Sequence, residues 1–157
     1  MTITSTSFKH HGVIPSRYTC DGQNLSPPLI WRGVPQDARS LVLIVDDPDV
    51  HDPRAPKAPK ATWVLYNIPP DMPGLPEGIA TGTLPHGILQ GENDWHEIGY
   101  HGPCPPTGSH RYRHKLFALN VVLPDLQRPT EAALENLIPA YTISRAELVA
   151  RYERQHS

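Results

Sequence analysis

Nineteen prolines are spread along this chain of 157 residues, more than twice the roughly 5% found in average proteins. Proline has a fixed φ and no backbone N–H, so it interrupts helices and sheet ladders. The segment from Gly99 to Gly108 carries Pro103, Pro105 and Pro106 and therefore cannot be a helix. Because the prolines lie between apolar runs, the sequence predicts a loop-rich folded domain rather than a disordered chain.

The residues after this segment alternate as in a β-strand. One face carries Tyr112, His114, Leu116 and Ala118, and the other carries Arg113, Lys115, Phe117 and Leu119. We therefore predict a strand over residues 112–123. The triplet His110-Arg111-Tyr112 joins the rigid loop to this strand, a position suited to forming one wall of a pocket.

Two apolar runs predict buried strands, one from Leu41 to Asp46 and one from Trp63 to Ile68. The first run ends at Asp47-Pro48-Asp49. Carboxylates at the end of a buried strand often point into a ligand site, but Asp-Pro-Asp is also ordinary turn chemistry. Both interpretations stay open at this point.

Two helices are predicted near the C-terminal end. Thr130 can cap a short helix that ends at Pro139 and has the apolar stripe Leu134, Leu137 and Ile138. The run Ser144-Arg145-Ala146-Glu147 matches a capping box for a second helix, in which Glu147 and Arg151 would form an i,i+4 pair. Short strands followed by two late helices indicate a mostly-β fold, with one domain over residues 1–157.

Charge and composition exclude several classes of protein. The formal net charge is −2 and there is no basic excess, which argues against a nucleic-acid-binding protein. The first residues, MTITSTSF, do not match a signal peptide, and no apolar run reaches the roughly 20 residues of a transmembrane helix. We expect a soluble cytoplasmic protein. Cys20 and Cys104 could pair in an oxidising compartment, but free thiols are the favoured prediction.

Five stretches stand in one order along the chain: RYTCDGQNLSPPLIW at 17–31, DDPD at 46–49, WVLYNIP at 63–69, GPCPPTGSHRY at 102–112 and AELVARYER at 146–154. Together they resemble the phosphatidylethanolamine-binding protein (PEBP) family, most closely its bacterial Raf kinase inhibitor-like branch of the YbhB/YbcL type. The resemblance covers nearly the whole chain. It implies a large antiparallel sheet packed against a smaller one, and it is compatible with a homodimer.

The resemblance also implies a small preformed anion pocket at one end of the sheet. Its lining here would be Asp47, Gly102, Pro105, Pro106, His110 and Tyr112, with Asp49 supporting the loop. A histidine ring and a tyrosine hydroxyl can both donate to phosphate oxygens, and backbone N–H groups near glycines add further donors. Each residue also has a structural alternative: the aspartates can cap a turn, His110 can be a structural histidine and Tyr112 a core residue. Arg111 points the other way, so we expect it to pair with a carboxylate.

The chain departs from the family pattern at one position. The family usually has a histidine immediately before the tryptophan of the second strand, where this chain has Thr62. An imidazole of the implied site is thereby replaced by a hydroxyl, which cannot carry charge. Lys60, two residues earlier, stands where an aromatic residue is common. It would restore a cation if its side chain reached inward, whereas a solvated lysine is the more usual outcome.

Val50 to Ala61 is a proline-rich loop containing His51, Arg54, Lys57 and Lys60. It is either a solvated connection or a cationic rim over the anion site.

Three functions compete. The first is binding of a small anionic or phosphorylated ligand, without cofactor or catalytic residues and with a regulatory role. The second is a kinase- or protease-inhibitor-like interaction protein. The third is an enzyme that uses Asp47 and His110 as an acid–base pair, or the Cys104 thiol as a nucleophile. No G-x-S-x-G motif supports a serine nucleophile at Ser109, and a metal site on His110 and His114 is the weakest interpretation.

Overall fold

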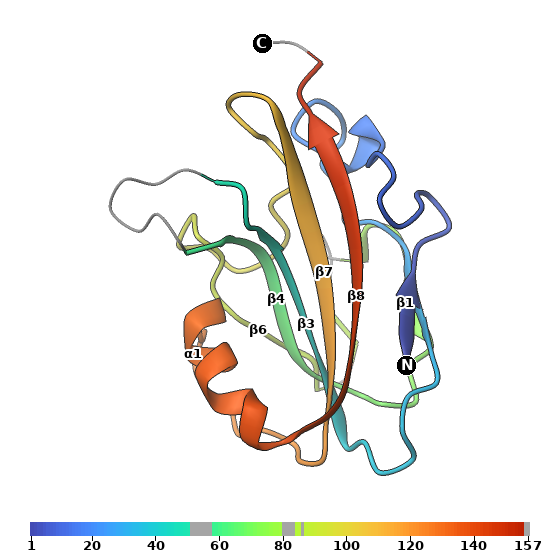
Figure 1. The fold of residues 1–157 in the computed structure, drawn as a ribbon. Coiled ribbons are helices and arrows are strands. Elements are labelled where there is room, and N and C mark those ends of the chain that lie inside the picture. The colour runs from blue at the N-terminus through green and yellow to red at the C-terminus, as the bar shows by residue number, and fades with distance from the viewer. Residues whose placement is uncertain (51–57, 80–83, 86, 156–157) are drawn as a thin grey trace.

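The strands form two antiparallel sheets in a computed structural model that describes residues 1–50, 58–79, 84–85 and 87–155 (Figure 1). The larger sheet has the order β6-β4-β3-β7-β8, and the smaller has the order β1-β2-β5. The mostly-β fold predicted from the sequence is confirmed. The strands of the larger sheet are β3 (Ser40–Asp47), β4 (Lys60–Ile68), β6 (Leu89–Gln90), β7 (Ser109–Leu119) and β8 (Thr142–Glu153), and those of the smaller sheet are β1 (Thr2–Thr4), β2 (Leu29–Arg32) and β5 (Gly74–Leu75).

Strand β3 is the centre of the larger sheet and is buried along its whole length. It pairs with β4 on one side and β7 on the other. Its apolar sequence fits this position, because a strand covered on both faces needs no polar alternation. Strand β7 begins at Ser109 and ends at Leu119, earlier at both ends than predicted.

Each face of the larger sheet buries its own hydrophobic core. Tyr112, Leu116 and Ala118 of β7 belong to the core between the two sheets, whereas Phe117 and Leu119 belong to the core on the opposite face. This division follows the predicted alternation along the strand. Figure 1 shows helix α1 (Glu131–Leu137) over one face and β1 on the other side.

Helix α1 forms where the sequence predicts it. The Thr130 side chain accepts a hydrogen bond of 3.1 Å from the Ala133 N–H and so caps the helix. Leu134 and Ile138 are buried against the sheet. The chain then continues through a short 3₁₀ turn, Ile138–Ala140, which contains Pro139.

The predicted second helix is wrong. Residues 144–152 lie within β8, whose pairing with β7 runs from Ser109↔Glu153 to Leu119↔Thr142. The buried residues Leu148, Ala150 and Tyr152 follow a period of two. Glu147 and Arg151 face Lys115 and Arg111 across the ladder instead of forming a helical pair. The long partner strand therefore overrides the capping-box pattern.

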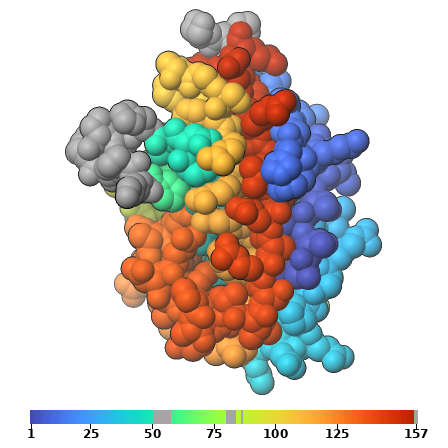
Figure 2. All heavy atoms as spheres, in the orientation of Figure 1, coloured from blue at the N-terminus to red at the C-terminus, as the bar shows by residue number. Residues whose placement is uncertain are grey.

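The outer edge of β8 is partly covered by the N-terminal segment. In Figure 2 the blue N-terminal residues lie along the red C-terminal strand. The His11 N–H donates to the Val149 carbonyl at 2.6 Å, and the Ile14 N–H donates to the Arg151 carbonyl at 2.9 Å. These bonds satisfy backbone groups that an open edge strand would leave unpaired.

Candidate functional site

A small cavity of about 40 Å³ lies where β3, β4 and β7 meet the loop before β7. One buried water needs about 10–15 Å³ of such space, so the cavity has room for only a few heavy atoms. The lining residues are Asp47, Val50, Lys60, Thr62, Trp95, Gly102, Cys104, Pro105, Pro106, His110 and Tyr112.

Asp47 and His110 form a buried pair in this cavity. The Nδ1 atom of His110 lies 2.6 Å from Oδ2 of Asp47. A carboxylate can only accept, so Nδ1 carries the proton and donates it to Asp47. The pair comes from neighbouring strands, Asp47 from the end of β3 and His110 from the start of β7. Since Nδ1 is engaged, Nε2 is the ring nitrogen left to meet a ligand.

The Asp-Pro-Asp motif has both of the roles left open by the sequence. Oδ1 of Asp47 accepts from the Asp49 N–H at 2.8 Å, which closes the turn. Asp49 is not part of the cavity lining. Its carboxylate accepts from Nε and Nη2 of Arg111 at 2.9 and 2.7 Å, and from the Arg111 backbone N–H. The predicted pairing of Arg111 with a carboxylate is confirmed, and it fixes the turn beside the cavity.

Tyr112 supplies a protonated hydroxyl to the cavity. Its side chain is buried in β7, two residues after His110 on the same face. Burial, and then the nearby Asp47 carboxylate, raise the pKa of Tyr112 well above its ordinary value of 10. The hydroxyl therefore keeps its proton at any physiological pH and remains a donor.

The proline-rich wall of the cavity is packed tightly against the segment before β2. The Gly102 N–H donates to Oδ1 of Asn24 at 2.9 Å, and the Tyr100 hydroxyl donates to the Tyr18 carbonyl at 2.7 Å. A Cβ on Gly102 would lie 2.1 Å from the Asn24 Oδ1 and 2.5 Å from the Tyr18 oxygen. Only glycine fits this position, because the two backbones approach too closely for a side chain.

The prediction of free thiols is wrong. Cys20 and Cys104 form a disulfide with a Cα–Cα distance of 5.5 Å, within the usual range for such bridges. The bridge reinforces the same contact, since the Cys20 N–H also donates to the Pro103 carbonyl at 3.2 Å. The bonded sulfur of Cys104 is not a free thiol, which removes the basis for the predicted thiol nucleophile.

Thr62 lies at an irregularity in β4. The register shifts between the pairs Val45↔Trp63 and Asp46↔Ala61, which leaves Thr62 as the extra residue of a β-bulge. Its hydroxyl donates to the Val45 carbonyl at 3.1 Å. Thr62 lines the cavity, but its hydroxyl proton is already donated to the Val45 carbonyl.

The structure brings most of the predicted residues together and adds others. Lys60 faces the cavity instead of being merely solvated, and Trp95 and Val50 were not predicted to line it. Trp95 lies in a polar segment whose sequence gives no periodic signal. Of the proposed cationic rim, His51, Arg54 and Lys57 lie outside the described residues.

His114 does not join His110 in a metal site. Its Nδ1 lies 3.1 Å from the Leu148 carbonyl, and its ring packs on Phe8 with centroids 5.5 Å apart. Burial lowers the pKa of His114 to about 4. The side chain is therefore a neutral, structural histidine at pH 7.

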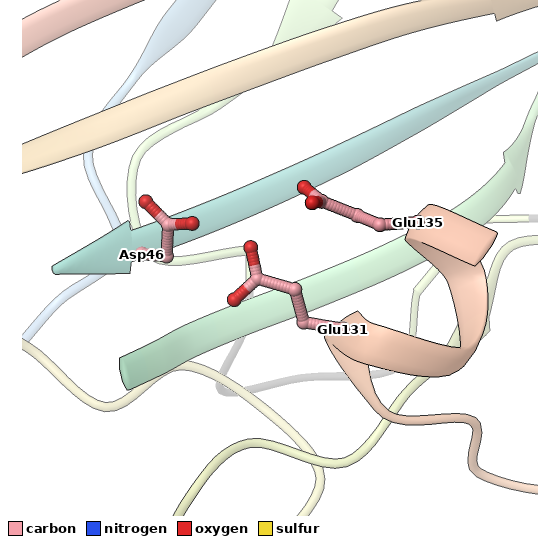
Figure 3. Close-up of side chains that lie close together, drawn as sticks. All are labelled: Asp46, Glu131 and Glu135. Atoms are coloured by element: carbon pink, nitrogen blue, oxygen red, sulfur yellow. The ribbon is translucent and has the colours of Figure 1, made fainter. Parts of the chain in front are cut away.

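A second group of ionisable residues lies beneath α1, on the other face of the sheet. Figure 3 shows the carboxylates of Asp46, Glu131 and Glu135 converging from β3 and α1. The Lys115 ammonium lies among them, 2.9 Å from Asp46 and 2.9 Å from Glu131, and also contacts Glu135. Arg113 makes a bidentate contact with Asp46.

The protonation of this cluster follows from its burial. Burial and the proximity of Asp46 raise the pKa of Glu131, so that Glu131 stays protonated. Its carboxyl O–H donates a hydrogen bond to the Asp46 carboxylate. Two remaining carboxylates then face two cations, and the cluster is neutral. Lys115 occupies the place that a metal ion would take, so this group is a structural ion-pair network.

In the part of the chain that the structure describes, no helix is both long and apolar enough to cross a membrane.

Comparisons with known proteins agree with the architecture. The model of the phosphatidylethanolamine-binding protein family matches residues 4–153. A UPF0098 protein of Methanothermobacter thermautotrophicus is 48% identical, with 98% of this chain and 99% of that protein aligned. The crystal structure of a PEBP homologue from Chlamydia trachomatis superposes with a TM-score of 0.90 at 39% identity, covering 98% of this chain and 97% of that one. Escherichia coli YbcL, described as a new member of the mammalian PEBP family, gives 0.87 at 32% identity, covering 98% of each chain.

Proposed function

Because the chain belongs to the phosphatidylethanolamine-binding protein family, we propose that the cavity beside His110 binds the anionic head of a small ligand, such as a phosphate group. The observation that carries this proposal is the Asp47–His110 pair, with 2.6 Å between Oδ2 and Nδ1. The carboxylate accepts from Nδ1–H and fixes the ring orientation, so that Nε2, when it carries a proton, can donate to an oxyanion. The protonated Tyr112 hydroxyl, which also interacts with Asp47, is a second polar group on the same face.

The dimensions of the cavity support an anionic head rather than a whole lipid. A volume of about 40 Å³, the space of about three or four waters, suits a compact polar head and leaves no room for an acyl chain. The wall around Gly102 is fixed by hydrogen bonds and the disulfide. The donors are therefore held in place before a ligand arrives, which lowers the entropic cost of binding.

Isothermal titration calorimetry tests this function. Inorganic phosphate, glycerol 3-phosphate and neutral glycerol are titrated into the wild type and the variants His110→Gln and Tyr112→Phe. We expect saturable binding of both phosphates, no binding of glycerol, and affinity lowered about tenfold or more in His110→Gln. Tyr112→Phe loses a single neutral donor and should cost less. Absence of phosphate binding by the wild type at millimolar concentration would overturn the proposal.

The same Asp47–His110 contact favours a second candidate, general acid–base catalysis on a small substrate. Incubation with p-nitrophenyl phosphate and p-nitrophenyl acetate separates the two functions. If the protein only binds its ligand, p-nitrophenol is released at the same rate with the wild type as with His110→Gln. Release that depends on His110 would favour the enzyme.

A further inference from the structure

Lys60 enters the cavity from β4, opposite Asp47 in the β3–β4 pairing. Its side chain is half-buried, and Nζ lies 4.2 Å from the centroid of a Trp95 ring. A lysine ammonium at this distance is attracted by the electrons of the indole. The cation is therefore held at the cavity instead of extending freely into water.

Trp95 is itself held in place by its neighbours. Its ring stacks on His101 with centroids 3.4 Å apart and an interplanar angle of 6°. The backbone N–H of His101 donates to the Thr62 carbonyl at 2.9 Å. Burial and the nearby Lys60 charge lower the pKa of His101, so at neutral pH its ring stacks in the uncharged form. This row of contacts therefore begins on β4 at Lys60, passes through Trp95 and His101, and returns to β4 at Thr62.

The charge of Lys60 is not neutralised within the described structure. Among the residues at 1–50, 58–79, 84–85 and 87–155, no carboxylate oxygen lies within ion-pair distance of its Nζ. Of the described residues, Asp47 alone brings a carboxylate to the cavity lining, and it is already engaged by His110 and by the Asp49 N–H. Lys60 is therefore the cation of the cavity lining that is left to face a ligand.

We propose that Lys60 is the residue that selects the charge of the ligand in this cavity, and that Trp95 positions its ammonium for this purpose. The inference rests on the proposed anion-binding function and narrows it. A site that presents the Lys60 ammonium beside further polar groups favours a doubly charged oxyanion over a singly charged one of similar size. The ligand class is then a phosphate dianion, either free or as the head of a monoester, in preference to a carboxylate. Thr62 cannot take this role because its hydroxyl is bonded to the Val45 carbonyl.

The test compares Lys60→Gln, Lys60→Arg and the control Lys9→Gln, which makes the same charge change at an exposed position. Calorimetry uses inorganic phosphate, glycerol 3-phosphate and acetate, so that a free ion, a monoester and a carboxylate are distinguished. We expect Lys60→Gln to weaken phosphate binding about tenfold or more, by the loss of one charge-assisted contact. Lys60→Arg should stay within about threefold of the wild type, and Lys9→Gln should not change. In Lys60→Gln the preference for phosphate over acetate should shrink by the same factor.

A spectroscopic readout checks the positioning role of Trp95. The Cε protons of Lys60 should resonate upfield because the adjacent Nζ lies over the Trp95 ring, 4.2 Å from its centroid, and the signal is assigned by its loss in Lys60→Gln. It should stay upfield in Trp95→Phe, lose the upfield shift in Trp95→Leu, and move when phosphate is added. Thermal unfolding of each variant verifies that it folds.

The outcomes separate the two claims. Wild-type protein that does not bind phosphate contradicts the proposed function itself. Wild-type protein that binds phosphate with the same affinity as Lys60→Gln contradicts only the role of Lys60. A Lys60 signal that stays unshifted throughout the titration contradicts its contact with the ligand.

Discussion

The Cys20–Cys104 disulfide should contribute about 4–5 kcal/mol to the free energy of unfolding. It joins residues 84 positions apart, and closing a loop of that length removes on the order of 15 cal/mol/K of chain entropy from the unfolded state. At about 25 °C this entropy corresponds to the stated free energy. The contribution is large compared with the 5–15 kcal/mol that typically stabilises a domain.

Urea unfolding followed by tryptophan fluorescence measures this contribution. The oxidised wild type is compared with the double variant Cys20→Ser/Cys104→Ser, in which serine preserves the size of the side chains. We expect a lower midpoint and a larger m-value, because the unfolded chain without its cross-link exposes more surface. An unfolding free energy within about 1 kcal/mol of the wild type would refute the loop-closure reasoning. Two reactive thiols in the folded, air-oxidised protein would refute the bridge itself.

Three further predictions follow from buried groups. Burial lowers the pKa of His114 to about 4, from 6.5 in the unfolded chain. The contribution of neutral His114 to the free energy of unfolding is therefore fully present above pH 6.5 and is lost as the pH falls towards 4, a loss of about 3 kcal/mol in total. Unfolding free energies at pH 7 and 4.5 should differ less in His114→Asn, which keeps a donor for the Leu148 carbonyl, and an unchanged difference would contradict this assignment. Lys115→Met leaves buried carboxylates unpaired and should cost about 3–5 kcal/mol, whereas Lys9→Met at an exposed site should cost less than about 0.5 kcal/mol; equal costs in urea unfolding would contradict the network. Gly102→Ala forces the cavity wall away from Asn24 and should cost about 1–3 kcal/mol; calorimetry should also detect weaker phosphate binding, and unchanged stability and affinity would refute the tight contact.

The sequence predicted the central part of the fold because local pattern and tertiary position agree there. The apolar run at 41–46 is the buried centre of the larger sheet, and the alternation after Tyr112 divides correctly between the two cores. Thr130 caps a helix as predicted, since a cap depends only on residues within one turn.

The errors arise where a distant partner decides the outcome. Residues 144–152 carry helix signals, but pairing with β7 makes them a strand. Cys20 and Cys104 are far apart in sequence, and only the packing of the Gly102 segment on residues near Tyr18 brings them together. Structural disulfides are characteristic of oxidising compartments and rare in the cytosol, so the bridge also weighs against the cytoplasmic location predicted from the N-terminal residues.

The candidate site was predictable only in part, because some of its features depend on residues that are distant in the sequence. The family resemblance identified Asp47, His110 and Tyr112, and the structure gives their geometry. The bulge that makes Thr62 an extra residue in β4 cannot be read from the sequence, and neither can the contact of Lys60 with Trp95, a residue 35 positions away in a loop. These features depend on strand register and loop packing.

The most direct test of the anion site is the ¹⁵N NMR signal of His110 during a titration with inorganic phosphate, assigned by its absence in His110→Gln. The site predicts a saturable shift of Nε2, because this nitrogen donates to the bound oxyanion, while Nδ1 stays in the range of a nitrogen bonded to Asp47. Phosphate at millimolar concentration that shifts neither nitrogen would contradict the account of the cavity as an anion site.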